Sequence, residues 1–467
     1  MSYYAIVTQL KEVRPHPNAD RLQLATVFGN TICIDLSYKE GQLGIYFPTG
    51  GQLSVKFAEA NNLLRKKDAE GNNIGGYMDP DKRNVTAIKL RGEKSDGLFL
   101  PLKCLEPFGD ISKLAMGDRI DVFNDEEICT KYIPRTQARR GHISEGNRTR
   151  KFKAPIAPTF AEHADTEQLA YNLGAFKIGD ELELSLKMHG TSQRTGHLKV
   201  LTGYKRSIMD RILHRPGKPV YDWGYVSGTR RVVLDTFEGG FYGSNEFRKQ
   251  HHDTFVGKLW KGETVYYEVV GFTHTGAPIM GNGTNEKLGK EFVKQYGKET
   301  VFSYGCDPRG YEEHYEQNHG EQSIVHIDKP VSDIYVYRMT MTNEDGEVVE
   351  YTPDFMRYRC EQMGVKTVPV FAHFIIPEFC QLSDDVGSLQ AVDAGEYVRK
   401  ITEDFYDGPD PIGKTHVREG VVVRILNRPK FCAYKHKNFS FKCLEGLVQA
   451  QLAESTEEIA EDVLAEM

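Results

Sequence analysis

Short segments in which apolar and polar residues alternate, each closed by a turn, constrain the fold of this chain most. In the first of them Leu22 and Leu24 alternate with polar residues, and Gly29 begins a turn before the alternation resumes. A period of two is the pattern of a β-strand with one buried face. Residues 1–125 are therefore predicted to form a small all-β domain.

A second strand pairing is expected near the end of this domain. Residues 85–90 and 97–102 both read as strands, and Arg91-Gly92 supplies a turn between them. Several short strands joined by turns suggest a small barrel, and the oligonucleotide-binding (OB) barrel is a common version. The segment His16–Leu22 also resembles the opening of tRNA-binding OB domains. We therefore expect an OB-like barrel in residues 1–125.

The rest of the chain is expected to contain three further segments. Residues 126–165 are basic and contain glycines and prolines, as a linker does. Residues 166–447 mix strand and helix patterns without a regular βαβ rhythm, which favours an α+β domain. Residues 448–467 are acidic and are predicted to form a C-terminal helix.

Composition excludes several classes of protein. The hydrophobic content of 39% is ordinary for a globular chain. No apolar run approaches the roughly 18 residues that a membrane span needs, and the N-terminus carries no secretion signal. Eight cysteines are present and none forms a C-x-x-C, so neither a zinc site nor a disulfide framework is indicated. We expect a cytoplasmic protein that does not bind membranes.

The net charge of −7 hides one strongly basic stretch. Between Lys131 and Lys153 eight basic residues stand against one acid, Glu145. Such a stretch is either a solvated face or a contact for a phosphate backbone. The candidates for nucleic-acid binding are Arg139, Arg140, Arg148 and Arg150.

Lysine chemistry is suggested by the segment Glu181–Ser192. Strand alternation places its leucines on one face and Lys187 on the other. A lysine that ends a strand and is followed by a glycine turn can present its amine to a cleft. The alternative is a surface lysine beside a turn.

Further motifs follow this lysine in a fixed order: Ser-Gly-Thr-Arg230-Arg, Val-Tyr-Tyr-Glu268-Val-Val-Gly, Asp-Ile-Tyr-Val-Tyr337-Arg, Arg-Glu419-Gly-Val-Val422-Val and Tyr-Lys435-His-Lys437-Asn. Their order and content resemble the covalent nucleotidyltransferases, the superfamily of polynucleotide ligases and mRNA capping enzymes. The strings Lys-Met-His-Gly-Thr and Asp-Ile-Tyr-Val-Tyr look like RNA ligases rather than DNA ligases.

This resemblance implies an adenylyltransferase domain of antiparallel sheets with helices, which uses ATP with Mg²⁺ or Mn²⁺. Lys187 is then the catalytic nucleophile that carries AMP, and Glu419 the carboxylate associated with the metal. Tyr337 is expected to stack on adenine opposite Val422. The remaining nucleotide-binding candidates are His189, Gly190, Arg230, Glu268, Lys435 and Lys437.

The chemistry of a lysine nucleophile agrees with this assignment. A free lysine has a pKa of about 10.4 and must lose its proton before it attacks. Nearby cations favour the neutral amine, and Lys435 and Lys437, two apart on a strand, point to the same face. Each residue also has a plain structural reading. Tyr337 is otherwise a core aromatic, and Glu268 and Glu419 are otherwise satisfied carboxylates.

Some features depart from the superfamily pattern. Leu186 precedes the lysine where many ligases have Glu, which leaves adenine recognition partly unexplained. The long span between Glu268 and Tyr337 indicates an insertion at about residues 275–330. Tyr304, within that insertion, is therefore a rival for the stacking role.

Residues 408–415 satisfy the P-loop pattern G-x-x-x-x-G-K-[ST]. Pro409 and Pro411 remove two backbone donors that a phosphate loop needs. The residues that follow, 417–425, are β-branched and predict a strand instead of the required helix. We therefore expect no P-loop here.

The domain order narrows the resemblance. Only 30 residues follow Lys437, too few for the OB domain that DNA ligases and capping enzymes typically place there. An N-terminal OB-like module together with residues 90–101 resembles the Deinococcus-type, or fifth, family of RNA ligases. That resemblance implies a monomeric enzyme sealing RNA 3′-OH and 5′-phosphate ends. The alternatives are a DNA ligase, a GTP-using capping enzyme, or a nucleic-acid-binding protein without catalysis.

Overall fold

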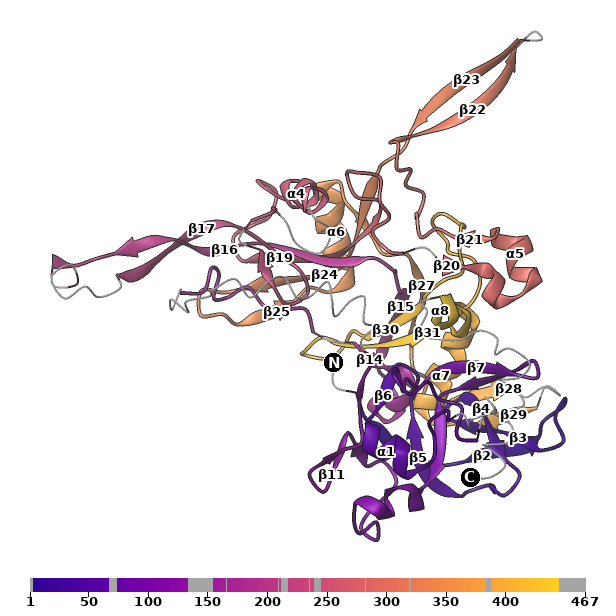
Figure 1. Cartoon of the computed structure of the whole chain (residues 1–467). Helices are drawn as coiled ribbons and strands as arrows, with labels where there is room; N and C mark the ends of the chain where they lie inside the picture. The colour runs from indigo at the N-terminus through magenta and orange to yellow at the C-terminus, as the bar shows by residue number, and fades with distance from the viewer. Residues whose placement is uncertain are drawn as a thin grey trace. The chain divides into compact units, whose positions relative to one another are not determined.

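The computed structural model resolves the chain into two compact units (Figure 1). The described residues are 3–66, 74–132, 154–164, 166–208, 210, 217–234, 236–238, 245–281, 283–318, 321–383 and 388–444. The first unit comprises residues 1–139, 283–299 and 439–467, and the second comprises residues 140–282 and 300–438. Each unit is described below by itself.

The first unit consists mainly of short antiparallel strands. Its strands are β1 (Ala5–Gln9), β2 (Lys11–Pro15), β3 (Leu22–Val27), β4 (Asn30–Asp35), β5 (Leu43–Phe47), β6 (Gly51–Leu53), β7 (Ala87–Leu90), β8 (Glu93–Asp96), β9 (Leu98–Pro101), β10 (Arg119–Ile120), β11 (Val122–Phe123), β12 (Glu126–Glu127), β13 (Cys129–Lys131) and β20 (Gly283–Thr284). Its helices are α1 (Val55–Ala60), η1 (Leu102–Phe108), η4 (Asn285–Leu288), α5 (Lys290–Tyr296) and α8 (Phe439–Leu444).

Two tight hairpins lie close to the turns that the sequence predicted, the first of them one residue earlier than expected. β3 and β4 are joined at Phe28 and Gly29, which both have positive φ, and β7 and β8 are joined at Arg91 and Gly92 in the same way. Two central residues with positive φ match the twist of the flanking strands. The predicted pairing of residues 85–90 with residues 97–102 was wrong. A two-residue turn forces β7 onto β8, and β9 pairs with β5 instead.

The described strands of this unit form separate small sheets. The largest has the order β10-β1-β5-β9, and another has the order β2-β3-β4. The first of these sheets packs on a core that includes Phe47 and Phe57, and the second packs on a separate core that includes Leu22 and Leu90. No closed barrel is found among the described strands, so the predicted OB-like barrel is not confirmed.

The second unit is a mixed α+β structure, as the sequence predicted for this part of the chain. Its strands are β14 (Glu167–Gln168), β15 (Glu181–Leu186), β16 (Thr191–Lys205), β17 (Lys218–Gly228), β18 (Val233–Leu234), β19 (Glu263–Gly271), β22 (Tyr311–Asn318), β23 (Glu321–Asp328), β24 (Ser332–Thr342), β25 (Val348–Glu350), β26 (Lys366–Thr367), β27 (Val370–Ile375), β28 (Gln381–Ser383), β29 (Leu389–Ala391), β30 (Gly420–Ile425) and β31 (Cys432–Lys437). Strand β21 (Glu299–Thr300) crosses the unit boundary. Its helices are η2 (Leu169–Tyr171), η3 (Leu173–Ala175), α4 (Glu246–Asp253), α6 (Pro353–Met363) and α7 (Ala394–Tyr406).

Two sheets organise the second unit. One has the order β14-β31-β30-β15-β27 and the other the order β18-β17-β16-β19-β24-β25. Apart from the parallel pairs β14–β31 and β24–β26, the pairings in these sheets are antiparallel. The chain passes from β15 of the first sheet to β16 of the second through residues 187–190. The turn that follows the predicted lysine therefore connects the two sheets.

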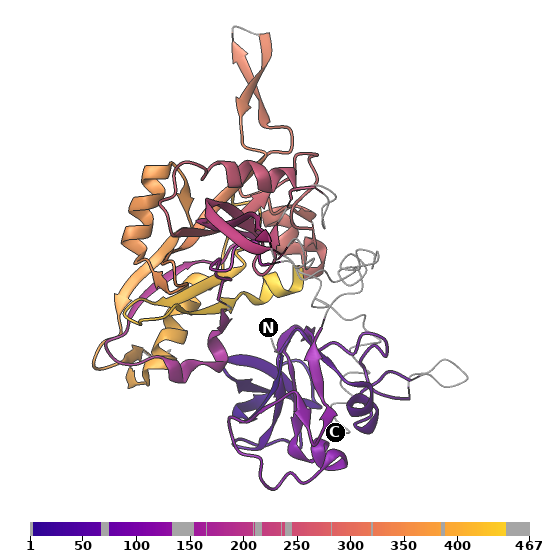
Figure 2. The ribbon, with the colours of Figure 1, turned by 90° about the vertical axis from the view of Figure 1, so that its left-hand side faces the viewer.

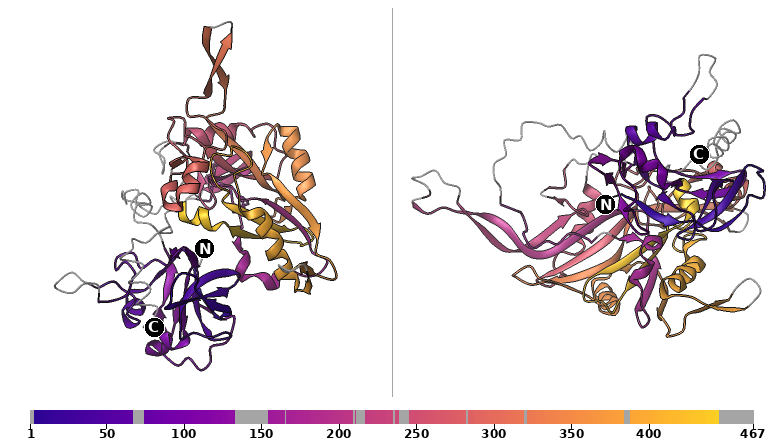
Figure 3. Two further views of the ribbon diagram at one scale, coloured as in Figure 1. Left: turned by 90° about the vertical axis from the view of Figure 1, so that its right-hand side faces the viewer. Right: turned by 90° about the horizontal axis from the view of Figure 1, so that it is seen from below.

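Two ribbons extend from the body of the second unit. Strands β16 and β17 continue as a two-stranded arm, and β22 and β23 form an antiparallel hairpin that pairs with no other described strand (Figures 2 and 3). The β22–β23 hairpin falls within residues 275–330, where the sequence indicated an insertion.

Residues 408–415, which match the P-loop pattern, are followed by a strand and not by a helix, as expected. β30 begins at Gly420, and Asp410 accepts backbone N–H bonds from Ile412 and Gly413. Two other predictions, the acidic helix at 448–467 and the arginines at 139, 140, 148 and 150, lie outside the described residues. No helix among the described residues is long and apolar enough to cross a membrane.

Candidate active site

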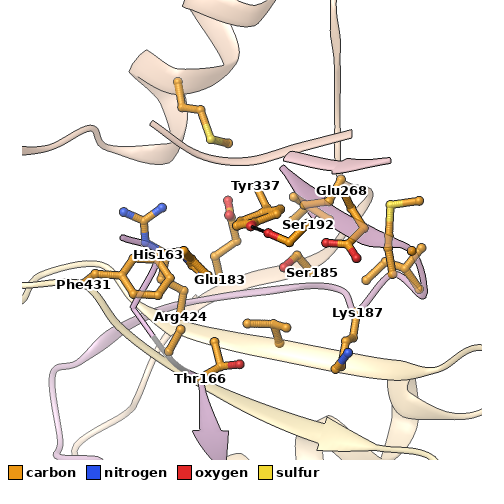
Figure 4. A pocket seen from close by; sticks show the side chains of 18 of the residues that line it. His163, Thr166, Glu183, Ser185, Lys187, Ser192, Glu268, Tyr337, Arg424 and Phe431 are labelled. Carbon is orange, nitrogen blue, oxygen red and sulfur yellow. Dashed lines mark hydrogen bonds between the residues drawn. The ribbon is translucent and has the colours of Figure 1, made fainter. Parts of the chain in front are cut away.

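A cavity of about 340 Å³ lies between the two sheets of the second unit (Figure 4). Strands β15, β27, β30 and β31 line it from one sheet, and β16, β19 and β24 line it from the other. Of the residues that the sequence singled out, six line this cavity: Lys187, Gly190, Arg230, Glu268, Tyr337 and Val422. Motifs more than 200 residues apart in the chain thus share one space.

The backbone of Lys187 is fixed by the neighbouring strand. Its N–H donates to the carbonyl of Gly420 at 3.0 Å, which continues the β15–β30 ladder by one residue. Gly420 has φ 146, and a Cβ there would lie 2.1 Å from the carbonyl oxygen of His436. Only glycine suits both constraints, so the residue after Glu419 holds Lys187 in place.

The ammonium group of Lys187 meets a buried carboxylate. Lys187 Nζ lies 2.5 Å from Glu419 Oε1, and Lys437 Nζ lies 3.1 Å from the same oxygen. His189 Nδ1 is 3.7 Å from Glu419 Oε2. Burial alone raises the pKa of the Glu419 carboxyl, but Lys187, Lys437 and His189 outweigh it and lower this pKa to about 2. Glu419 therefore stays ionised at neutral pH.

Lys435 and Lys437 extend toward this cluster from β31. Gly420 is the register partner of Lys437, and Val422 is the partner of Lys435. Burial, followed by the charges of Lys187 and Lys437, lowers the pKa of Lys435 to about 7. Both lysines were expected to point to the same face of their strand and to supply positive charge to Lys187.

We expect nucleotide binding to weaken as pH rises through the pKa of Lys435. Below pH 7 the ammonium is ready to meet a phosphate, whereas above it the neutral amine must take up a proton on binding. Affinity for an ATP analogue that cannot be cleaved at the α-phosphate should fall by up to about 20-fold between roughly pH 6.5 and 8.5. Isothermal titration calorimetry in two buffers measures both the affinity and the proton uptake.

A Lys435→Arg variant is the control for this pH effect, because guanidinium stays charged over the whole range. It should flatten the profile. An equally steep profile in this variant would assign the titration to another group, with Glu268 next in line.

The two tyrosines proposed for base stacking occupy different positions. The ring of Tyr337 lines the cavity, and its hydroxyl lies 2.9 Å from Ser192 Oγ. Tyr304 is buried, accepts the His189 N–H at 2.8 Å and is not among the cavity-lining residues. Tyr304 therefore supports the turn at His189 from outside the cavity.

Close packing on the β16–β19 side explains Gly190. A Cβ at this position would lie 2.4 Å from the carbonyl oxygen of Val269 and 2.8 Å from Glu268 Cγ. Burial, only partly offset by Lys187, raises the pKa of Glu268 to about 7. Arg230 and Glu268 line the cavity together with Lys187, and Glu268 lies on the same side of it as Lys187 (Figure 4).

The Glu419 carboxylate is suited to bind a divalent cation that also contacts a nucleotide. Glu419 Oε2 is buried and has no hydrogen-bond partner in the structure. No cluster of three or more His, Cys, Asp or Glu side chains suited to a metal occurs among the described residues. Mg²⁺ usually binds one or two carboxylates and completes its coordination with water and substrate phosphates, so one ionised carboxylate is compatible with such a site.

Several cavity residues were not singled out from the sequence. Glu183 and Ser185 precede Lys187 by four and two residues on β15, and the strand period of two puts them on the same face. That alternation was a usable signal. The same alternation places Arg424, two residues after Val422 on β30, on the cavity face. His163 and Phe431 gave no local signal, because they reach the cavity from the predicted linker and from the β30–β31 connection.

No protein-family model matches the chain, and no curated protein matches it. Solved structures of Naegleria gruberi RNA ligase are similar to it. A lysine-to-alanine variant with ATP and Mn has 15% identity and a TM-score of 0.51, over 96% of this chain and 99% of that one. The chain has the fold of an RNA ligase.

Two further structures of that ligase agree. A lysine-to-methionine variant with AMP and Mn has 14% identity and a TM-score of 0.50, over 94% of this chain and 97% of the other. The ligase with PPi has 16% identity and a TM-score of 0.50, over 94% and 97%. The similarity spans both units, so the α+β class is confirmed for the chain as a whole. At these identities it establishes the fold alone.

Proposed function

We propose that this chain is an ATP-dependent RNA ligase that carries AMP on Lys187. The observation that carries the proposal is the cluster around the Lys187 amine. A strand-end lysine, an ionised buried carboxylate and the lysines of β31 meet at one end of a cavity that also holds Tyr337 and Val422. The similar Naegleria structures were solved with ATP, AMP, PPi and Mn, which supports the same ligands here.

The arrangement accounts for the first chemical step. The Lys187 amine attacks the α-phosphorus of ATP, a P–N bond forms and the bond to pyrophosphate breaks. Lys435 and Lys437 would hold the phosphate oxygens as their negative charge grows. Arg230 and Glu268 line the same cavity and would contact the ribose and phosphate, and His189 would contact phosphate.

Glu419 would hold a divalent cation, Mg²⁺ or Mn²⁺, together with the nucleotide. Such an ion supplies further positive charge to the phosphates. In the nucleotide-free chain the same carboxylate instead pairs with Lys187 and Lys437.

The AMP is then transferred to the 5′-phosphate of an RNA end, and a 3′-OH displaces it to seal the strand. We assign the enzyme to the Deinococcus-type ligases because its candidate nucleic-acid module, residues 1–125, precedes the catalytic domain. Arg139, Arg140, Arg148 and Arg150 are proposed to contact the RNA backbone, since phosphate contacts position a substrate. A monomer in a reducing cytoplasm agrees with the free thiols of the cysteines in the described residues.

The direct test is covalent labelling. The intact chain is incubated with Mg²⁺ and with ATP or GTP labelled at the α-phosphate, then denatured and separated by electrophoresis. Label from ATP, released as AMP in acid as expected for a P–N bond, supports the proposal. Label from GTP alone would point to a capping-type enzyme, and no label to a non-catalytic binding protein.

Replacement of the stacking residue should raise the ATP requirement. A base stacked on an aromatic side chain gains roughly 1–3 kcal/mol, so Tyr337→Leu should raise the ATP concentration for half-maximal labelling by about tenfold. Tyr304→Leu is the matched control, because it removes a buried tyrosine outside the cavity and should have the smaller effect. The reverse ranking would move the adenine platform to Tyr304.

A further inference from the structure

The arm formed by β16 and β17 displays a row of aromatic side chains on one face. Its antiparallel register pairs His197 with Tyr225, Lys199 with Trp223 and Leu201 with Tyr221. Side chains alternate between the two faces of a strand, so these three pairs share one face. After a bulge near Leu201, Tyr204 pairs with Pro219 and returns to the same face. Four aromatic residues, Tyr204, Tyr221, Trp223 and Tyr225, therefore follow one another along the arm.

Two lysines flank the tryptophan in this row. Lys199 Nζ lies 4.8 Å and Lys261 Nζ 5.5 Å from the centre of the Trp223 ring. Neither lysine is buried, and Trp223 is only partly buried. An aromatic ring with two ammonium groups over it is suited to a ligand that combines an aromatic base with a phosphate.

On the aromatic face, Tyr225 packs against the core that includes Phe255 and accepts the Gly257 N–H at 2.8 Å. The opposite face of the arm packs on another core. Leu198 and Val226 lie there in a small core with Phe160. Asp222, which pairs with Val200, also belongs to that opposite face. The acidic side chain of β17 is thus turned away from the aromatic row.

The aromatic row also meets the end of the basic stretch. The hydroxyl of Tyr204 accepts the Ala154 N–H at 3.1 Å, and the hydroxyl of Tyr221 donates to the Pro155 carbonyl at 3.1 Å. Lys151 and Lys153 come directly before Ala154 in the sequence. The chain that carries the basic run therefore joins the arm beside its aromatic row.

We propose that this row, named here the Trp223 face (Tyr204, Tyr221, Trp223, Tyr225, Lys199 and Lys261), binds a single strand of RNA, one base stacking on Trp223. Aromatic side chains interleaved with cations are what sequence-tolerant single-strand binders use. β16 begins at Thr191 beside Lys187, and Lys199 is eight residues further, about 26 Å at the rise of a strand. The Trp223 face would therefore bind a part of the RNA strand that lies away from the ends being joined. The choice of RNA as the polymer rests on the proposed function.

The chain has two tryptophans, which permits a direct optical test. In Trp260→Phe the remaining tryptophan is Trp223. A single-stranded oligouridylate of about 16 nucleotides, within the site sizes of single-strand binders, should quench its fluorescence saturably. The midpoint should match the affinity from anisotropy of a labelled copy of the RNA. Binding by anisotropy without any change in Trp223 emission would overturn the proposal.

Substitutions test the same face in the otherwise intact chain. Trp223→Ala should weaken oligouridylate binding by about 5- to 100-fold, and Trp223→Phe by much less, because a ring remains. Lys199→Ala should lower the slope of log affinity against log salt by about 0.7. Lys205→Ala, on the opposite face by the register, is its control and should change the slope less. Thermal melting confirms folding for each variant.

The outcomes separate this inference from the proposed function. Labelling of the unsubstituted chain by ATP is measured separately from RNA binding. Quenching and weakened binding without any labelling would support the Trp223 face while the ligase proposal fails. Labelling by ATP together with unchanged RNA binding in Trp223→Ala, or no RNA binding in any form of the chain, would overturn the inference.

Discussion

Replacing Lys187 by alanine should abolish covalent labelling of the protein by ATP. The amine of Lys187 is the nucleophile in the proposed reaction. It lies 2.5 Å from Glu419 Oε1, and Lys437 Nζ lies 3.1 Å from the same oxygen. Lys187→Arg should fail as well, because a guanidinium does not lose its proton at any accessible pH. Gel analysis of protein incubated with α-labelled ATP measures both variants.

Lys177→Ala is the matched control for this loss. Lys177 is an exposed lysine shortly before β15 and does not line the cavity. Its replacement should leave labelling unchanged. An adduct formed at the normal rate by folded Lys187→Ala would show that the AMP is carried elsewhere. The cluster around Glu419 would then be a structural ion-pair network.

Local patterns were sufficient to predict the strand that presents Lys187. Leu182 and Leu184 are fully buried and the lysine emerges on the other face, as a period of two requires. The same rule placed Lys435 and Lys437 on one face of β31. In both cases the prediction needed only neighbouring residues.

The assembly of the site could not be derived from local pattern. Lys187 and Glu419 are 232 positions apart, and their contact depends on β15 pairing with β30 rather than with a sequence neighbour. His163 lies in a segment that composition marked as a linker, yet its ring centre is 5.0 Å from that of Tyr337. The order of the motifs predicted that these residues belong to one site, but only the register of the sheets shows how they lie in it. The partner of β7 was predicted wrongly for a local reason. Residues 93–96 were treated as part of the loop after Arg91, whereas they form strand β8.

Replacing Glu419 by glutamine should suppress labelling by ATP at least about 100-fold, more than the effect usual for residues that only support a metal ligand. The substitution removes the proposed cation ligand, and it leaves Lys187 and Lys437 without their shared counter-ion. Among the described residues, no other carboxylate that pairs with Lys187 is left to hold the cation. Raising the concentration of Mn²⁺, which binds most sites more tightly than Mg²⁺, should restore part of the labelling.

Glu263→Gln separates this chemistry from simple loss of a buried ion pair. Glu263 is fully buried and binds Arg359 at 2.8 Å, but it does not line the cavity. Breaking a buried pair by removing one partner costs about 3–5 kcal/mol of stability, so both variants should melt at a lower temperature. Glu263→Gln should nevertheless keep its labelling at temperatures where it is folded, while Glu419→Gln should not. Equal labelling by the two variants, measured per folded molecule, would remove Glu419 from the proposed site and leave the Lys187 amine without a metal-binding neighbour.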